Sequence, residues 1–293
     1  MPLARLILTR LTIMNIFYEL IDSGEGRRLE CWGNYVLDRP DPQIIWRKNL
    51  PISEWQKADA FFKRISEDKG TWTIKTKVPE KWILEHDNIK FYAKLSPFKH
   101  TGIFPEQSTQ WDYIFDKVKD EEQELKVLNL FAYTGIASLF AAKAGASVTH
   151  VDSSKPAITW ANENRALNDV NWPIRWIVDD AIKFTEREIK RGVKYDAIIM
   201  DPPAYGHGPA GEVWDFNRHF PELLKNCKQI LSNNPLFVLA NAYAISSSSI
   251  TLANTLNDYF GNLGGSIENG ELTLKESSAG RLLSTGIWAR WEK

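Results

Sequence analysis

The sequence predicts an α/β protein with a mainly parallel sheet, an antiparallel last strand and a small β-rich domain at its amino-terminal end. From residue 125 to residue 260, strand-like apolar runs alternate with helical segments, which is typical of right-handed β-α-β units on a parallel sheet. No helical segment separates the last two runs, 270–276 and 283–291, so the last strand is expected to be antiparallel. Short apolar runs and turn signals before residue 97 indicate the β-rich domain.

The β-rich domain contains four recognisable elements. Residues 23–26, Ser-Gly-Glu-Gly, predict a hairpin turn between two short strands. Residues 54–65 are expected to form a short helix. The alternating pattern of residues 71–78 predicts a half-buried strand, and residues 89–95 predict another.

A connecting helix within residues 105–125 leads into the sheet domain. The strands expected in the parallel part of the sheet are 126–131, 147–152, 174–178, 196–201 and 235–241. The helices expected to follow these strands are 134–145, 154–168, 181–192, 220–232 and 249–260.

The chain is therefore expected to have four parts. Residues 14–96 form the β-rich domain, residues 97–125 a linker helix with a pocket segment, and residues 126–293 the sheet domain. Residues 1–13 are apolar but interrupted by arginines, which does not fit a secretory signal. The lack of acids before Glu19 would suit an organelle presequence, but we favour translation from Met14, with residues 1–13 outside the fold.

The composition is that of an ordinary globular protein. Of 293 residues, 43% are hydrophobic and 25% are charged, which excludes a disordered or collagen-like chain. No apolar run approaches the roughly 20 residues that a membrane helix needs. Two cysteines, Cys31 and Cys227, cannot support a disulfide framework. We expect a soluble, cytoplasmic enzyme.

Charge is divided unevenly along the chain. Residues 1–100 carry a net charge of +4, whereas the whole chain carries −1. Such a division is a hint that one part meets a polyanion. Four charges in 100 residues is also within ordinary variation, so this hint stays open.

The first strand of the sheet domain ends in the small-residue turn Asn129–Gly135, which leads into a helix. At such a turn the backbone can approach a ligand closely and helix-terminal N–H groups face it. The dinucleotide fingerprint G-x-G-x-x-G and the phosphate loop are both absent. Nicotinamide chemistry is therefore disfavoured.

Acidic residues follow the second and third strands of the sheet domain. Asp152 comes about 20 residues after the turn, where an acid can accept hydrogen bonds from both hydroxyls of a ribose. Asp180 follows the third strand, where a carboxylate can accept from an amino group. Either residue alone could equally be a helix cap. In this order and spacing, the two favour an adenosine ligand that needs no phosphate.

The fourth strand ends in Asp201-Pro-Pro-Ala-Tyr-Gly206. The two prolines fix an extended backbone whose carbonyls lack local donors. A carboxylate and bare carbonyl oxygens are thus expected beside the adenosine, and Tyr205 could stack against a base. A plain strand-ending turn is the alternative.

Together these motifs resemble the class I S-adenosylmethionine-dependent methyltransferases over roughly residues 97–293. NLFAYTG, VTHVD, the DDA acid and DPPAYG are most similar to the large-subunit ribosomal RNA methyltransferase branch, which includes cytosine carbon-5 and guanine nitrogen-7 enzymes. Residues 99–107, KHTGIFPEQ, are similar to the segment that lines the cofactor pocket there. The resemblance implies a Rossmann-like sheet, S-adenosylmethionine as cofactor and RNA as partner.

The resemblance also implies residue roles. The turn would hold the methionine end of the cofactor chiefly through backbone groups, Asp152 would take the ribose hydroxyls, and Asp180 the adenine amino group. The cofactor-binding residues so implied are Phe104, Gln107, Asn129, Phe131, Ala132, Tyr133, Thr134, Gly135, Asp152, Ser153, Asp180 and Asp201. The catalytic residues so implied are Asp201, Pro202, Pro203 and Tyr205.

The sequence departs from the carbon-5 enzymes in lacking their cysteine. Carbon-5 methylation needs a thiolate that attacks the ring, but residues 241–243 are Asn-Ala-Tyr where those enzymes carry cysteine. Cys227 is expected in the core. A nitrogen acceptor needs only hydrogen-bond acceptors and a stacking face, which Asp201, the Pro202 carbonyl, Tyr205 and Asn241 or Tyr243 could provide. We therefore expect methylation of an RNA base at nitrogen.

Other features leave alternatives open. The glycine-rich loop 206–214 is either a mobile lid over the substrate or a flexible surface loop. The histidines lack ligand spacing, so no metal site is expected. The acceptor could instead be a small molecule or a protein, or the chain could be a non-catalytic RNA-binding protein with a relic cofactor fold.

Overall fold

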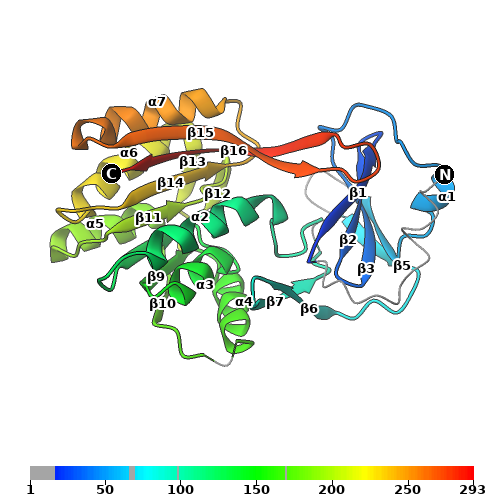
Figure 1. Ribbon diagram of the computed structural model, residues 1–293, viewed down its shortest axis with the longest axis horizontal. Coiled ribbons are helices and arrows are strands. Elements are labelled where there is room, and N and C mark those ends of the chain that lie inside the picture. Colours follow the sequence, from blue (N-terminus) through cyan, green and yellow to red (C-terminus); the bar gives the residue numbers. More distant parts are fainter. Residues whose placement is uncertain (1–16, 66–69, 98, 169) are drawn as a thin grey trace. The chain divides into compact units, whose positions relative to one another are not determined.

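The computed structural model describes residues 17–65, 70–97, 99–168 and 170–293 (Figure 1). The expectation for residues 1–13 lies outside the described residues. Contacts divide the chain into two compact units. The first contains the described residues up to Asn88, Ala93–Thr101 and Lys275–Arg281, and the second contains Ile89–Tyr92, Gly102–Leu274 and Leu282–Lys293. The expected boundaries at residues 96 and 125 stay predictions.

The first unit is built on a five-stranded sheet in the order β1-β2-β3-β4-β5. Its strands are β1 (Glu19–Gly24), β2 (Arg27–Trp32), β3 (Tyr35–Pro40), β4 (Ala60–Arg64) and β5 (Gly70–Ile74). Leu29, Trp55 and Ala58 form a buried apolar cluster in this unit. A two-stranded hairpin of β6 (Lys81–His86) and β7 (Ile89–Lys94) follows in the chain.

The helix expected over residues 54–65 is largely wrong. The helix α1 covers only Ile52–Trp55, and Ala60–Arg64 forms β4, which pairs parallel with β3 and antiparallel with β5. Asp59 separates the two elements: its carboxylate accepts hydrogen bonds from Val36 N at 2.8 Å and from Thr76 Oγ1 at 2.7 Å. Tertiary pairing of this kind overrides a local helical pattern.

The second unit contains a seven-stranded sheet in the order β10-β9-β8-β11-β14-β16-β15. The strands are β8 (Lys126–Leu130), β9 (Ser147–Asp152), β10 (Ile174–Val178), β11 (Ala197–Met200), β14 (Phe237–Ala242), β15 (Ser266–Lys275) and β16 (Leu282–Glu292). The first five in spatial order pair in parallel, and β16 pairs antiparallel with β14. The expected Rossmann-like sheet with an antiparallel last strand is confirmed.

Helices cover both faces of this sheet (Figure 1). They are α2 (Ser108–Lys119), α3 (Ile136–Lys143), α4 (Lys155–Ala166), α5 (Ala181–Arg191), α6 (Phe216–Ile230) and α7 (Ser249–Phe260), with short 3₁₀ turns η2 (Pro105–Gln107) and η3 (Gly261–Leu263). One apolar core joins the sheet to α5, α6 and α7, and a second joins it to α2 and α3. Among the described helices, none is both long and apolar enough to cross a membrane.

Two segments near residue 210 differ from the sequence-based expectation. The loop 206–214 forms a small antiparallel hairpin of β12 (Tyr205–His207) and β13 (Val213–Asp215), in which Gly206 pairs with Trp214. The helix expected from residue 220 begins earlier, at Phe216, because the Asp215 carboxylate caps it by accepting from Arg218 N at 3.0 Å.

Candidate active site

The carboxyl ends of the parallel strands meet at one edge of the sheet and bring the predicted residues together. In spatial order, β10 ends before Asp180, β9 ends at Asp152, β8 leads into the turn 131–135, and β11 ends before Asp201. Ligands of open α/β sheets bind at this edge, where the strand order reverses. Here the reversal lies between β8 and β11.

The turn after β8 has an unusual backbone. Phe131 and Tyr133 have positive φ angles of 53° and 48°, and Gly135 has 84°. Positive φ is rare for bulky residues and concentrates at functional sites. Only glycine fits at position 135, because an added Cβ would lie 2.9 Å from the Cβ of Ala161. Ala132 O accepts a 3.0 Å bond from Gly135 N, which closes the turn.

Two predicted cofactor residues use their side chains inside the protein. Asn129 is buried, and its Nδ2 donates to Ser138 Oγ at 2.9 Å, which in turn lies 3.0 Å from His150 Nδ1. Thr134 Oγ1 donates to Gly102 O at 2.7 Å. Both side chains are engaged in hydrogen bonds within the protein, so a ligand at the turn would contact only the backbone of residues 129 and 134.

Asp152 holds the turn from the neighbouring strand. Its Oδ2 accepts a 2.8 Å hydrogen bond from Tyr133 N, and its Oδ1 accepts one from Ser154 N at 2.8 Å. Burial raises the pKa of this carboxyl despite the two backbone donors. Asp152 does not cap helix α4, because the cap is Ser154, whose Oγ accepts from Ala157 N. Each carboxylate oxygen keeps a further lone pair for a ligand.

Asp180, in contrast, is a helix cap. Its Oδ1 accepts from Lys183 N at 3.0 Å at the start of α5. The adjacent Asp179 forms an ion pair with Arg187. The side chain of Asp180 also lines a pocket at the strand ends, so capping and ligand contact are compatible there.

This pocket opens to solvent, and its space, part of which is open solvent, amounts to about 490 Å³. The strand ends contribute acidic and small residues, and the β12–β13 hairpin contributes a wall. The lining residues are Phe131, Val151, Asp152, Ser153, Asp179, Asp180, Ala181, Pro203, Gly206, His207, Gly208 and Trp214. Among the described residues, no lysine or arginine lines this pocket. The lining therefore suits an uncharged or cationic ligand with a flat apolar part, and it is unsuited to a phosphate.

The segment that precedes α2 is fixed to the turn and to Asp201. The ring of Phe104 lies 5.8 Å from that of Tyr133. Gln107 Nε2 donates a 2.5 Å hydrogen bond to Asp201 Oδ2. Gly102 approaches the ring of Trp160 so closely that a Cβ would lie 2.2 Å from it. The two predicted pocket residues of this segment, Phe104 and Gln107, thus lie beside the turn and beside Asp201 respectively.

Asp201 is the most perturbed acid at this edge. Burial, opposed by the Gln107 hydrogen bond and reinforced by the negative charge of Glu106, raises the pKa of Asp201 to about 6. Pro202 is buried, and Tyr205 is 60% exposed with its ring edge-on to His207 at 5.4 Å. Tyr205 is therefore available to stack against an incoming flat group.

One expectation about the prolines is wrong. The carbonyl of Pro203 is not bare, because it accepts a 2.6 Å hydrogen bond from Trp214 Nε1. Trp214 is buried and its ring lies 4.8 Å from that of Phe131. The donor comes from the far strand of the hairpin, which local sequence could not reveal.

The structure adds residues to the site that the motifs did not indicate. Glu106 is buried beside Gln107. Glu212, near the tip of the hairpin, pairs with Lys183 on α5, and Ser153 Oγ donates to His207 O at 3.5 Å. These contacts hold the hairpin against the pocket rim.

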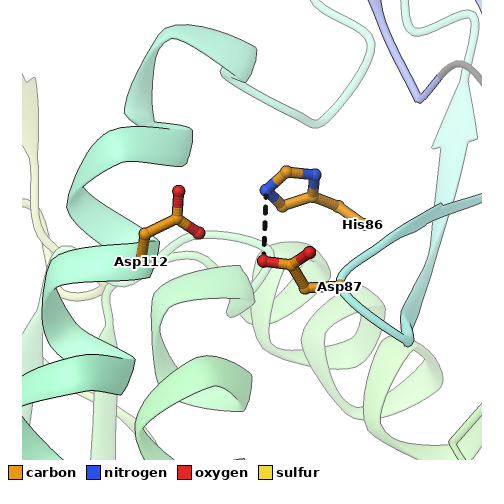
Figure 2. Close-up of side chains that lie close together, drawn as sticks. All are labelled: His86, Asp87 and Asp112. Atoms are coloured by element: carbon orange, nitrogen blue, oxygen red, sulfur yellow. Dashed lines mark ion pairs between the residues drawn. The ribbon is translucent and has the colours of Figure 1, made fainter.

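No metal site is assigned. His86 is the last residue of β6 and Asp87 follows it, with Nε2 of His86 3.9 Å from Oδ2 of Asp87 (Figure 2). Asp112, also labelled there, belongs to α2 in the second unit. Two adjacent side chains within one unit do not supply the three or four protein ligands that stable sites use.

Comparisons with known proteins agree with this geometry. A family model described as S-adenosylmethionine-dependent methyltransferase matches residues 52–251. The crystal structure of a SAM-dependent methyltransferase from Agrobacterium tumefaciens is 43% identical and superposes with a TM-score of 0.91, covering 94% of this chain and 90% of that one. The chain belongs to the S-adenosylmethionine-dependent methyltransferase family, and S-adenosylmethionine is its cofactor.

Curated relatives extend the comparison. A protein named ribosomal RNA large subunit methyltransferase K/L from Pseudoalteromonas atlantica is 32% identical over 198 residues, which are 67% of this chain and 25% of that protein. Its namesake from Shewanella frigidimarina is 32% identical over 206 residues, 67% of this chain and 26% of that protein. The chain thus spans about a quarter of the length of the curated relatives it matches.

The pocket fits this cofactor by the chemistry of its side chains. Asp152 carries acceptor oxygens of the kind that ribose hydroxyls bond to, Phe131 and Pro203 present apolar surface of the kind that an adenine ring packs on, and the acidic lining suits a cationic ligand. When bound, S-adenosylmethionine supplies an activated methyl group, and the protein mainly supplies alignment, which can contribute about 7–11 kcal/mol.

Proposed function

We propose that this enzyme methylates a nitrogen atom of a base in ribosomal or other RNA. The observation that carries the choice of nitrogen is the state of the cysteines. Cys227 is fully buried on α6, and burial raises the pKa of its thiol, while Cys31 lies on β2 in the first unit. Neither supports the thiolate attack that carbon-5 methylation of cytosine requires.

A nitrogen acceptor needs less from the protein. Its lone pair attacks the methyl carbon directly, so the enzyme has only to orient the base and exclude water. We assign the Asp201 carboxylate to accept a hydrogen bond from the base, and the exposed ring of Tyr205 to stack on it. Pro202 and Pro203 would hold the backbone beside the methyl group.

RNA is proposed as the acceptor on two grounds. The curated relatives carry the name of ribosomal RNA methyltransferases, and residues 1–100 carry a net charge of +4, which suits contact with backbone phosphates. A small molecule or a protein remains the second candidate acceptor.

We further propose the cofactor roles that follow from the site. The backbone of residues 129–135 would hold the methionine end, with Ala132 and Gly135 permitting close approach. Asp152 would bind the ribose, Ser153 and Asp180 would contact the adenine, and Phe104, Tyr133 and Gln107 would close the methionine side.

The decisive experiment uses labelled S-adenosylmethionine with ribosomal subunits and naked RNA from cells that lack the gene. The RNA is digested to nucleosides, and mass spectrometry identifies the labelled one. Label on a nitrogen-methylated nucleoside is expected, and Asp201→Asn enzyme is the matched negative control. Label on 5-methylcytosine would overturn the nitrogen assignment. If no RNA is labelled although the enzyme still binds S-adenosylhomocysteine, the RNA proposal is wrong and the acceptor is a small molecule or a protein.

A further inference from the structure

A buried histidine precedes Asp152 on β9. His150 has no exposed surface and pairs in the parallel ladder with Asn129 on β8. His150 and Asp152 are two positions apart on one strand, so their side chains lie on the same face of the sheet. An added Cβ at Gly135 would lie 3.3 Å from Cε1 of His150. The edge of the imidazole ring therefore lies against the turn after β8.

The hydrogen bonds of Ser138 determine which ring nitrogen of His150 carries the proton. Ser138 Oγ accepts a 2.9 Å bond from Asn129 Nδ2 and lies 3.0 Å from His150 Nδ1. The one hydroxyl proton of Ser138 is thus directed at Nδ1, which must be the acceptor nitrogen. Burial lowers the pKa of the imidazole to about 3, so the ring is neutral at neutral pH. Its proton is therefore on Nε2.

This Nε2–H is a buried donor that needs an acceptor. Among the described residues, no partner of His150 Nε2 meets full hydrogen-bond geometry. An unsatisfied buried donor costs about 1–3 kcal/mol, so it calls for an explanation. The backbone of Tyr133 favours a proton on the ring. This is the effect of a carbonyl oxygen, since the N–H of Tyr133 donates to Asp152.

Tyr133 is the residue of the turn with the greatest need of support. Its φ angle of 48° lies in the left-handed region, which bulky residues adopt only where their surroundings fix it. Asp152 fixes Tyr133 N at 2.8 Å, and Asn164 Nδ2 fixes the next carbonyl, Thr134 O, at 2.9 Å. The carbonyl of Tyr133 lies between these two supports and is the acceptor left for His150.

We propose that His150 is a positioning residue for the cofactor. Its Nε2–H donates to the Tyr133 carbonyl and, with Asp152 on the N–H, holds Tyr133 in the conformation that receives the methionine end of S-adenosylmethionine. The hydrogen bond tightens when the cofactor binds, as such contacts commonly do. His150 itself touches neither cofactor nor acceptor. The inference rests on the role proposed for residues 129–135 and is independent of the RNA assignment.

Calorimetric titration with two ligands separates positioning of the turn from a general effect on the fold. S-adenosylhomocysteine carries the amino-acid end, whereas adenosine lacks it. His150→Phe keeps a ring against Trp176 but loses the donor. In this variant the dissociation constant of S-adenosylhomocysteine should rise by about tenfold, the equivalent of one hydrogen bond. That of adenosine should change by less than about threefold.

Two amide variants provide matched controls. His150→Gln can place an N–H near the position of Nε2 and should recover most of the affinity for S-adenosylhomocysteine. His150→Asn reaches only the position of Nδ1 and should not. Equal weakening of both ligands in His150→Phe, or equal behaviour of the Gln and Asn variants, would overturn the proposal.

Nitrogen-15 NMR of the histidine-labelled wild-type chain tests the tautomer without a variant that must fold. The expected spectrum shows His150 neutral with its proton on Nε2, and S-adenosylhomocysteine should slow exchange of this proton with water by about tenfold or more. A proton on Nδ1, or exchange that the ligand leaves unchanged, would refute the role of His150. If wild-type protein binds adenosine as tightly as S-adenosylhomocysteine, the role proposed for the turn fails, and this inference falls with it.

Discussion

Gln107 donates a 2.5 Å hydrogen bond from Nε2 to Oδ2 of Asp201, across 94 residues of sequence. The bond fixes the orientation of the acid at the end of β11 and occupies one of its oxygens. The other oxygen is the one that we propose accepts a hydrogen bond from the base. A side chain from outside the sheet therefore orients the carboxylate that we assign to catalysis.

Replacing Asp201 should separate turnover from cofactor binding. In Asp201→Asn, methyl transfer should fall by about 100-fold or more, because a charged acceptor of hydrogen bonds is lost where alignment matters most. Binding of S-adenosylhomocysteine, measured by calorimetry, should change by less than about threefold, since this neutral ligand does not use the charge. Loss of S-adenosylhomocysteine binding would place Asp201 in a structural role.

The pH dependence of methyl transfer should report on the same acid. Asp201 has a pKa raised to about 6, so the ionised form is lost as the pH falls through this value. The rate at subsaturating acceptor should therefore rise with pH and level off above about pH 7. Glu106 and Gln107 are the groups that act on this carboxyl.

Two variants should shift the apparent pKa of the pH–rate profile in opposite directions. Glu106→Gln removes a negative charge and should lower the apparent pKa in the pH–rate profile. Gln107→Leu removes a hydrogen bond to the ionised form and should raise it. A profile that is identical in both variants would assign the titration to another group.

Asp152→Ala should weaken cofactor binding. Its carboxylate is the only one at this edge, among the described residues, that holds the β8 turn through Tyr133 N and also faces the pocket. Loss of charge-assisted hydrogen bonds of about 1.5–3 kcal/mol each should raise the dissociation constant by at least about tenfold. Asp258→Asn, an exposed carboxylate on α7, is the control. Unchanged affinity of Asp152→Ala would refute the ribose assignment.

Two glycines offer a matched test of the turn. Gly135 has φ 84° and no room for a Cβ, whereas Gly192 has φ 68° and nothing within 4 Å of an added Cβ. Gly192→Ala should lower the free energy of unfolding by about 1–2 kcal/mol, the cost of the left-handed conformation. Gly135→Ala should lower the free energy of unfolding by about 1–3 kcal/mol more than this, because the added Cβ overpacks against Ala161. Denaturant unfolding measures both, and equal losses would contradict the close approach to Ala161.

The sequence predicted the site best where the information is local. A strand that ends in an acid or in a small-residue turn places that residue at the sheet edge, and Asp152, Asp180 and Asp201 all follow parallel strands at this edge. The same patterns could not tell a cap from a ligand-facing acid. That distinction depends on Ser154, which takes the capping role at α4 and leaves Asp152 to hold the turn.

The features that could not be predicted depend on distant partners. Residues 60–64 form a strand because β3 and β5 flank them. The segment after the prolines forms a hairpin because Trp214 bonds to Pro203 and packs on Phe131. Each partner stands in or near a segment that the sequence picks out, but no local pattern says that these segments pair with each other.

The tip of the β15–β16 hairpin, Lys275–Arg281, belongs to the first unit. There Ser277 N donates to Leu20 O at 2.8 Å, and Glu276, which is 1% exposed, accepts from Ser23 N at 3.0 Å. On the ribosome, the amino-terminal strands emerge long before these partners are made. The first unit therefore cannot be completed until translation has passed residue 281. Until then, Ser23 N and Leu20 O of β1 lack the partners that they have in the folded protein. Carboxy-terminal truncations should therefore impair both units at once.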